Sequence, residues 1–266
     1  MKKLYFIVLA IIGIYACFNL SSCSKDDKDE PSTPEASVKM RPIFIGWYDE
    51  ENKDFYNSYQ NITYNEGLQV KSYIDVTRGG ESKYEYQYSQ NSITVSVTGI
   101  TGDKYIYNYG LSNGKIITDG EYEFEYDGNR LSRTISIDYI DNITHYYWNN
   151  GNITKREDEG STVCTYIYTD YPMYIWIQAE FRGYAEEVFE CADPFLVQQG
   201  YYGVVPVNWV KEMSETYLDR YRTDMVRCSY EFNEYGYPIE IRRESRGGDN
   251  GDYEDVEVVK IVWEKY

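Results

Sequence analysis

Histidine, zinc-binding cysteine motifs and basic charge are all scarce in this chain, and each shortage argues against a class of function. The 266 residues contain one histidine, His145, and no Cys-x-x-Cys motif. Zinc sites are built from His and Cys at short, regular spacings, so we expect no metal site. No arrangement of nucleophile, base and orienting group stands out either. We therefore expect no cofactor and no enzymatic activity.

The charge is strongly one-sided. Lys and Arg number 26 against 44 Asp and Glu, which gives a formal net charge of −18. Such a surface repels phosphate backbones, so nucleic acid is not an expected partner. It is not drawn to anionic lipid either, and any membrane attachment must come from acyl chains.

The first residues have the pattern of a secretory signal peptide. Lys2 and Lys3 precede an apolar run from Leu4 to about Phe18, and Leu20-Ser21-Ser22-Cys23 follows. These residues resemble a bacterial lipobox, which implies cleavage before Cys23 and a lipid on its sulfur. A single transmembrane anchor is the alternative, although the run is shorter than the ~20 residues that a membrane span needs.

We therefore divide the chain into a signal peptide (1–22), a lipidated and disordered tether (23–40) and one β-domain (41–266). The tether is charged and contains Pro31 and Pro34, so it cannot bury apolar surface. Its acidic start resembles the export signal of surface lipoproteins in some Gram-negative bacteria, which implies outward display on the outer membrane. The alternative is a solvated spacer that faces the periplasm.

Tyrosine is the abundant residue, with 32 copies, and it recurs in a repeating unit. Each unit has alternating aromatics, then a turn with Asn, Asp or Gly, then Ile or Leu at the start of a new alternation. The last aromatic of successive units falls at residues 64, 88, 109, 126, 148 and 168. A spacing near 20 residues is two short strands with two turns, and Asn-Gly or Asp-Gly supplies the positive φ of a tight turn. Consecutive hairpins predict an all-β, curved antiparallel meander that approaches a barrel.

The alternation within each unit predicts which face is buried. Tyr122, Phe124 and Tyr126 share one face, with glutamates on the other. By the same alternation we expect Ile135, Ile137 and Tyr139 to lie on a buried face. The concave face of the sheet is then packed on itself or on an insertion.

One loop-plus-helix insertion is expected at about 171–223, where the repeat is interrupted. Asn208 can cap a helix over 208–222 in which Val210, Met213, Tyr217 and Tyr221 share a stripe. We expect this helix to pack as core against the open sheet.

Three features of the sequence together resemble a known family. They are the repeats, the interrupting Gly-Tyr-Tyr-Gly-Val-Val-Pro at 200–206 and the closing Tyr-Glu-Phe-Asn-Glu-Tyr-Gly-Tyr-Pro at 230–238. It is the bacterial lipoprotein family of domain of unknown function 4595, described as porin-like in fold. The resemblance covers most of residues 50–266. It implies a curved antiparallel meander and no established activity, and it brings no catalytic residues.

The favoured function is a non-catalytic, surface-displayed module that binds a glycan or a protein, with Trp148, Trp176 and Trp209 as candidate binding residues. The alternative is an open barrel that carries an apolar ligand between its sheet and the 208–222 helix.

Insertion into the membrane as a barrel is disfavoured, because Lys83, Glu123, Glu125 and Asp138 lie on the second face. The pairing of Cys164, Cys191 and Cys228 is left open.

Overall fold

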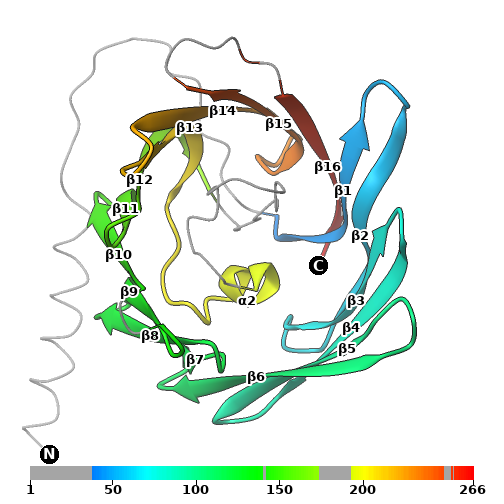
Figure 1. The fold of residues 1–266 in the computed structure, drawn as a ribbon. Coiled ribbons are helices and arrows are strands. Elements are labelled where there is room, and N and C mark those ends of the chain that lie inside the picture. The colour runs from blue at the N-terminus through cyan, green and yellow to red at the C-terminus, as the bar shows by residue number, and fades with distance from the viewer. Residues whose placement is uncertain (1–37, 140–141, 174–192, 249–252, 254) are drawn as a thin grey trace, which may run out of the picture. The chain divides into compact units, whose positions relative to one another are not determined.

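A computed structural model describes residues 38–139, 142–173, 193–248, 253 and 255–266. Within these residues, sixteen antiparallel strands form a closed barrel in which each strand pairs with its neighbours in sequence and β16 pairs with β1. Figure 1 shows this ring of strands with one short helix, α2, inside it. The all-β meander predicted from the repeats is confirmed, and the sheet closes.

The elements have the following bounds: β1 Met40–Asp49, β2 Asp54–Tyr64, β3 Val70–Thr77, β4 Gly80–Tyr88, β5 Ser92–Thr98, β6 Lys104–Ser112, β7 Lys115–Thr118, β8 Tyr122–Asp127, β9 Arg130–Ser136, β10 Ile143–Asn149, β11 Asn152–Asp158, β12 Thr162–Pro172, α2 Pro194–Gln198, β13 Asn208–Tyr217, β14 Arg222–Phe232, β15 Pro238–Gly247 and β16 Asp255–Lys265.

The two ends of the barrel differ in their connections. One end carries the turns 64–70, 88–92 and 232–238. Odd-numbered strands begin at this end, and even-numbered strands finish at it. The connection from β12 to β13 also leaves this end, and its residues 193–207 lie inside the ring with α2 (Figure 1). We call residues 193–207 the plug, this end the plug end and the opposite end the far end.

Tight turns join the hairpins as the sequence predicts. Asn113 and Gly114 between β6 and β7, and Asn150 and Gly151 between β10 and β11, all have positive φ, from 48° to 81°. Two successive residues of positive φ match the right-handed twist of the flanking strands. Asn tolerates this conformation better than other residues with a Cβ, and Gly adopts it freely.

The repeated aromatic has one structural role around the barrel. Seven of the eight even-numbered strands carry, near the plug end, a Tyr or Trp that donates a hydrogen bond to a backbone carbonyl of the preceding odd-numbered strand. We call this set the aromatic girdle. Its bonds run from Tyr64 to Pro42, Tyr88 to Val70, Tyr126 to Ile116, Trp148 to Leu131, Tyr168 to Ile153, Tyr230 to Val210 and Trp263 to Pro238.

Each girdle carbonyl lies beside a register shift in the strand pairing. For example, the β10–β11 pairing shifts between Tyr147 and Trp148, and Ile153, opposite Trp148, is the residue whose carbonyl accepts from Tyr168. A β-bulge disrupts the ladder locally. An aromatic hydroxyl or indole N–H that reaches such a carbonyl satisfies it while the ring stays in the core.

The predicted faces are confirmed for β8 and wrong for β9. Phe124 is 3% exposed, with Glu123 and Glu125 exposed on the outer side. Ile135, however, pairs with Glu123 and faces outward, and Ile137 and Tyr139 beyond β9 are exposed. The register shift that places Leu131 inward also turns Thr134 and Ser136 inward, so the alternation reverses within β9.

The insertion is narrower than predicted, and its helix is elsewhere. Residues Asn208–Tyr217 form strand β13, so the predicted helix over 208–222 is wrong. The helix in the described part of the insertion is α2, five residues that begin after the N-cap Asp193. The expectation that the concave face packs on an insertion is confirmed, because Phe195, Leu196 and Val197 of α2 are at most 2% exposed.

Candidate binding site at the plug end of the barrel

Aromatic contacts hold the plug against the inner wall. The Phe195 ring lies 4.7 Å from that of Tyr73 on β3, and the Tyr202 ring lies 5.2 Å from that of Phe124 on β8. Asp193 accepts hydrogen bonds from two backbone N–H groups of α2 and from the Tyr86 hydroxyl at 2.8 Å. The plug is therefore fixed to the wall at β3, β4 and β8.

The plug also completes the weakest seam of the wall. β7 and β8 share one paired position, Thr118 with Glu123. Plug backbone groups bond on both sides of this seam: the Ile116 N–H donates to the Tyr201 carbonyl, and the Val204 N–H donates to the Asn129 carbonyl, both at 2.8 Å. The plug thus serves as part of the wall as well as filling of the core.

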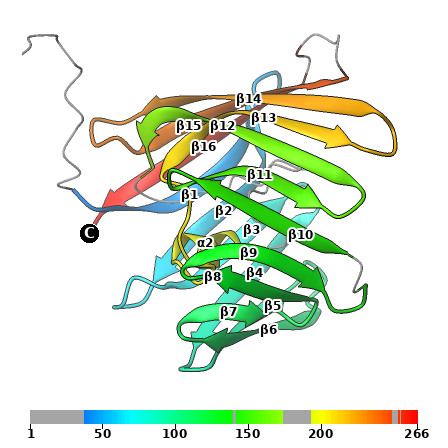
Figure 2. The same ribbon diagram turned by 90° about the vertical axis from the view of Figure 1, so that its left-hand side faces the viewer.

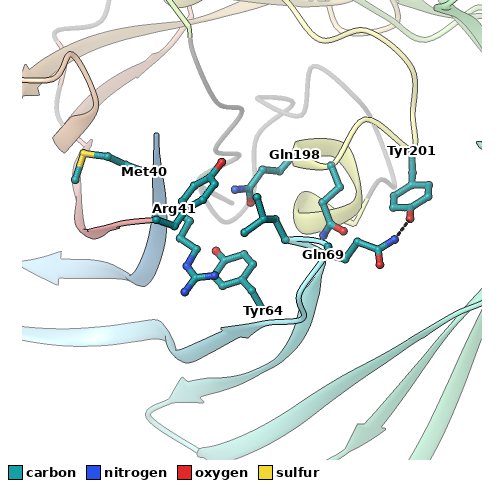
Figure 3. Close-up of a pocket in the computed structure, with 10 residues that line it drawn as sticks. Met40, Arg41, Tyr64, Gln69, Gln198 and Tyr201 are labelled. Carbon is teal, nitrogen blue, oxygen red and sulfur yellow. Dashed lines mark hydrogen bonds between the residues drawn. The ribbon is translucent and has the colours of Figure 1, made fainter. Parts of the chain in front are cut away.

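A pocket of about 300 Å³ lies between the plug and the wall at the plug end. Figure 3 shows that Gln198 and Tyr201 come from the plug, whereas Arg41 and Tyr64 come from the wall. The full lining is Met40, Arg41, Tyr64, Gly67, Leu68, Gln69, Gln198, Gln199, Tyr201 and Tyr266. Small-molecule sites begin at roughly this size.

The amides around the pocket are held in place. The Gln69 amide donates to the Tyr201 hydroxyl at 2.5 Å and accepts from the Asn65 amide at 2.9 Å. Gln199 accepts from the Tyr88 hydroxyl at 3.2 Å and donates to the Phe195 carbonyl at 2.9 Å. A polar lining whose rotamers are fixed in this way is preorganised, so binding loses little further side-chain entropy.

The cation in the pocket is already balanced. The Arg41 guanidinium pairs with Glu264 at 2.6 Å and lies 4.7 Å from the ring centre of Tyr64 and 5.7 Å from that of Tyr266. Burial raises the pKa of Tyr64 well above its usual value, and Arg41 offsets part of that rise. The pocket thus offers aromatic rings, neutral amides and a compensated charge.

The turn at the rim of the pocket is strained. Leu68 has φ of 62°, and its side chain is 39% exposed in the pocket lining. A non-glycine residue in this conformation costs about 1–2 kcal/mol. Such residues often occur at functional sites.

The inner wall toward the far end carries a second polar cluster, built of ion pairs. Arg243 is 2% exposed and pairs with Glu257 at 2.7 Å, and Arg222 pairs with Asp224 at 2.6 Å. Arg156, whose side chain is 4% exposed, pairs with Asp158. Charges with such partners are the usual way in which a buried ionic group is accommodated, so we assign this cluster a structural role.

The tryptophans that the sequence suggests as ligand-binding residues do not lie together in the structure. Trp209 is 4% exposed in the core, and Trp148 is half-buried as part of the girdle. Trp176 lies outside the described residues. Neither Trp148 nor Trp209 lines the plug-end pocket.

The single histidine and the described cysteines are not gathered at the pocket. The imidazole of His145 lies 3.2 Å from Glu159 on the outer side. Cys164 is buried, and burial raises the pKa of the Cys228 thiol to about 12. Cys191 lies outside the described residues, so the pairing of the three stays open.

The pocket itself could not be found from the sequence. Its lining comes from the first strand, the 64–70 turn, the plug and the chain's last residue, which are brought together by barrel closure. One partial signal exists: Tyr64 ends the first repeat, and the last aromatic of each repeat marks the plug end.

Two solved structures share this architecture. A porin-like protein from Bacteroides uniformis aligns with a TM-score of 0.62 and 14% sequence identity, over 88% of this chain and all of the other. A porin-like protein from Bacteroides vulgatus aligns with a TM-score of 0.53 and 11% identity, over 83% of this chain and 97% of the other. What they share is the fold.

No family model matches the chain, so the resemblance to domain of unknown function 4595 stays a prediction. No curated protein matches it either.

Proposed function

We propose that this protein is a non-catalytic lipoprotein module, anchored in the outer membrane by a lipid on Cys23, whose plug-end pocket binds a neutral glycan. The observation that carries the proposal is the lining of that pocket. The Tyr266 ring is 50% exposed and can stack on a sugar face, while Gln69 and Gln198 offer amides to ring hydroxyls. Because Glu264 already balances Arg41, an uncharged ligand fits better than an anionic one.

The outward-facing residues support the proposal that the barrel lies in water rather than in the bilayer. Ion pairs lie on its outward face around the ring: Lys83–Glu85, Arg133–Glu125, Lys155–Glu157, Arg227–Glu244 and Arg242–Glu50. A charged side chain on a lipid-facing strand costs up to about 2–4 kcal/mol near the middle of the bilayer. The lipid on Cys23 then supplies the membrane attachment, and the acidic start of the tether favours display on the outside of the cell.

The filled interior supports binding rather than conduction or the transport of an apolar ligand. The carrier hypothesis requires a cavity between the sheet and a helix over 208–222, and those residues form β13, the turn after it and the first residue of β14. Plug side chains fill the corresponding space, with Phe195, Leu196 and Tyr202 at most 2% exposed.

The glycan proposal is tested with the secreted, lipid-free protein on a glycan array, followed by calorimetry on each hit. We expect Gln198→Ala and Tyr266→Ala each to weaken binding by about tenfold, the loss of one hydrogen bond or one stacking contact. The matched control is Gln87→Ala, an exposed glutamine on the outer face of β4, which leaves the affinity unchanged.

Two outcomes would contradict the proposal. One is a folded protein that binds no glycan on the array. The other is a glycan hit whose affinity is the same in Gln198→Ala, Tyr266→Ala and wild type, because the bound sugar would then lie elsewhere on the barrel.

A further inference from the structure

One strand of the barrel has an edge that its neighbour covers only in part. β6 pairs with β5 along seven positions from Lys104 to Gly110. On its other side, β7 covers Gly110, Leu111 and Ser112. Among the described residues, the first half of β6 therefore has no strand on its second side. Figure 2 shows β6 next to the much shorter β7.

The side chains along this half of β6 are exposed to solvent. Tyr105, Ile106 and Tyr107 are 54%, 65% and 49% exposed. Tyr105 and Tyr107 pair with Val97 and Val95, which are at most 6% exposed, so the two tyrosines extend the barrel's inner face beyond its last covered strand. Alternation places Ile106 on the outer face.

The hydrogen bonds identify which backbone groups the open edge presents. The Leu111 N–H donates to the Asn91 carbonyl beside β5, and the Asp103 carbonyl accepts from the Gly99 N–H. Because the N–H and C=O of one residue point to the same edge and adjacent residues alternate, the odd-numbered residues from 103 to 111 bond toward β5. Ile106 and Asn108 then direct their N–H and C=O groups to the open edge.

We propose that this edge, Lys104–Asn108, binds an extended peptide of a partner protein as an added antiparallel strand. Unpaired strand edges are templates for such addition, with backbone bonds giving affinity and alternate side chains giving specificity. One face of the added strand packs beside Tyr105 and Tyr107, which calls for apolar residues at alternate positions.

Charge decides what kind of peptide fits and argues against a second copy of this chain. The open edge, residues 104–108, carries one charged side chain, Lys104, in a chain whose net charge is −18. In antiparallel addition the carboxyl end of the peptide lies beside Lys104, so an acidic residue there is favoured. Two copies of the chain repel each other through their net charge, and a strand of this length buries far less than the roughly 1,200 Å² of a stable interface.

The probe is a fluorescent peptide of alternating valine and threonine with aspartate at its carboxyl end, titrated onto the secreted, lipid-free protein and followed by anisotropy. Ile106→Pro removes an outward N–H without touching the β5 ladder, and proline is tolerated on sheet edges. We expect it to weaken binding by at least about tenfold, whereas Ile106→Thr, which keeps the N–H, binds like wild type. Unchanged circular dichroism shows that both variants are folded.

A second probe separates strand addition from apolar adhesion. The same peptide, N-methylated at alternate residues so that it cannot donate toward β6, should bind at least about tenfold more weakly. The proposal is overturned if wild type binds neither peptide, if the methylated peptide binds equally well, or if Ile106→Pro binds like wild type. Sedimentation that shows a dimer abolished by Ile106→Pro would also overturn it in favour of a second copy.

Discussion

At the register shifts of this barrel, strand carbonyls accept hydrogen bonds from single tyrosine hydroxyl or tryptophan indole groups. Tyr168 donates to the Ile153 carbonyl at 2.7 Å, and its ring lies against the core. We expect Tyr168→Phe to lower the free energy of unfolding by about 1–3 kcal/mol, because the ring stays while the carbonyl of the buried Ile153 loses its donor. Urea denaturation measures the change.

The control for Tyr168→Phe is Tyr221→Phe, since Tyr221 is 94% exposed in the β13–β14 turn. It should leave the free energy of unfolding unchanged within measurement error. Equal effects of the two substitutions would show that the girdle hydrogen bonds contribute nothing.

The sequence indicates where most girdle residues lie, although not what they do. The last aromatic of each repeat falls at 64, 88, 109, 126, 148 or 168, and five of these six residues donate a girdle hydrogen bond. What the repeat could not indicate is the role of the polar atom, because the carbonyls that accept these bonds are set by register shifts. The same shifts reversed the predicted faces at Ile135.

The plug depends on one close backbone approach. Gly203 has φ of +84°, and a Cβ there would lie 2.3 Å from the Asn129 carbonyl oxygen. Gly203→Ala must therefore push the plug away from the β8–β9 turn and break the bond from the Val204 N–H. We expect thermal and urea unfolding to show a loss of roughly 2–5 kcal/mol.

Comparison with Gly160→Ala separates two costs of Gly203→Ala: the steric clash with Asn129, and the placing of a residue with a Cβ at positive φ. Gly160 also has positive φ, +75°, but a Cβ there meets nothing within 4 Å. We expect it to cost about 1–2 kcal/mol. If the two substitutions destabilise the protein equally, the plug is not held closely against the wall.

The mistaken helix over 208–222 has a physical cause in β13. A strand on the inner wall should alternate apolar and polar residues, but Glu215 is buried at 6% and a register shift falls at Val210. These interruptions hide the two-residue period, and the spacing of Met213, Tyr217 and Tyr221 then matches a helix by coincidence. A buried ionic residue inside a barrel gives no sequence signal of its own.

For the whole molecule, the excess of buried tyrosine predicts a sharp alkaline limit. Burial raises the pKa of eleven tyrosines above the usual value near 10: Tyr64, Tyr73, Tyr86, Tyr88, Tyr109, Tyr126, Tyr166, Tyr168, Tyr202, Tyr217 and Tyr230. Their contribution to stability is fully present below pH 10 and is lost as the pH rises toward the folded-state pKa. Each removes roughly 1.4 kcal/mol per pH unit above about pH 10.

Together these groups remove roughly 15 kcal/mol over the first pH unit above pH 10, which is as large as the usual 5–15 kcal/mol of stability. We therefore expect cooperative unfolding between about pH 10 and 11, with tyrosinate absorbance and far-ultraviolet circular dichroism changing together. A gradual titration of these tyrosines while the barrel keeps its circular dichroism would contradict the burial described here.

The central claim for the whole molecule is that a water-exposed, plugged barrel is attached to the membrane only through Cys23. The direct test is the full mature chain with Cys23→Ser, secreted behind a leader that is cleaved without lipidation, compared with wild type by detergent-free fractionation. We expect wild type to sediment with membranes and the variant to be in the soluble fraction with unchanged circular dichroism, because ion pairs lie on the outward face around the ring. A folded variant that remains in the membrane pellet in wild-type amounts would contradict this claim, and would show that the barrel itself enters the bilayer.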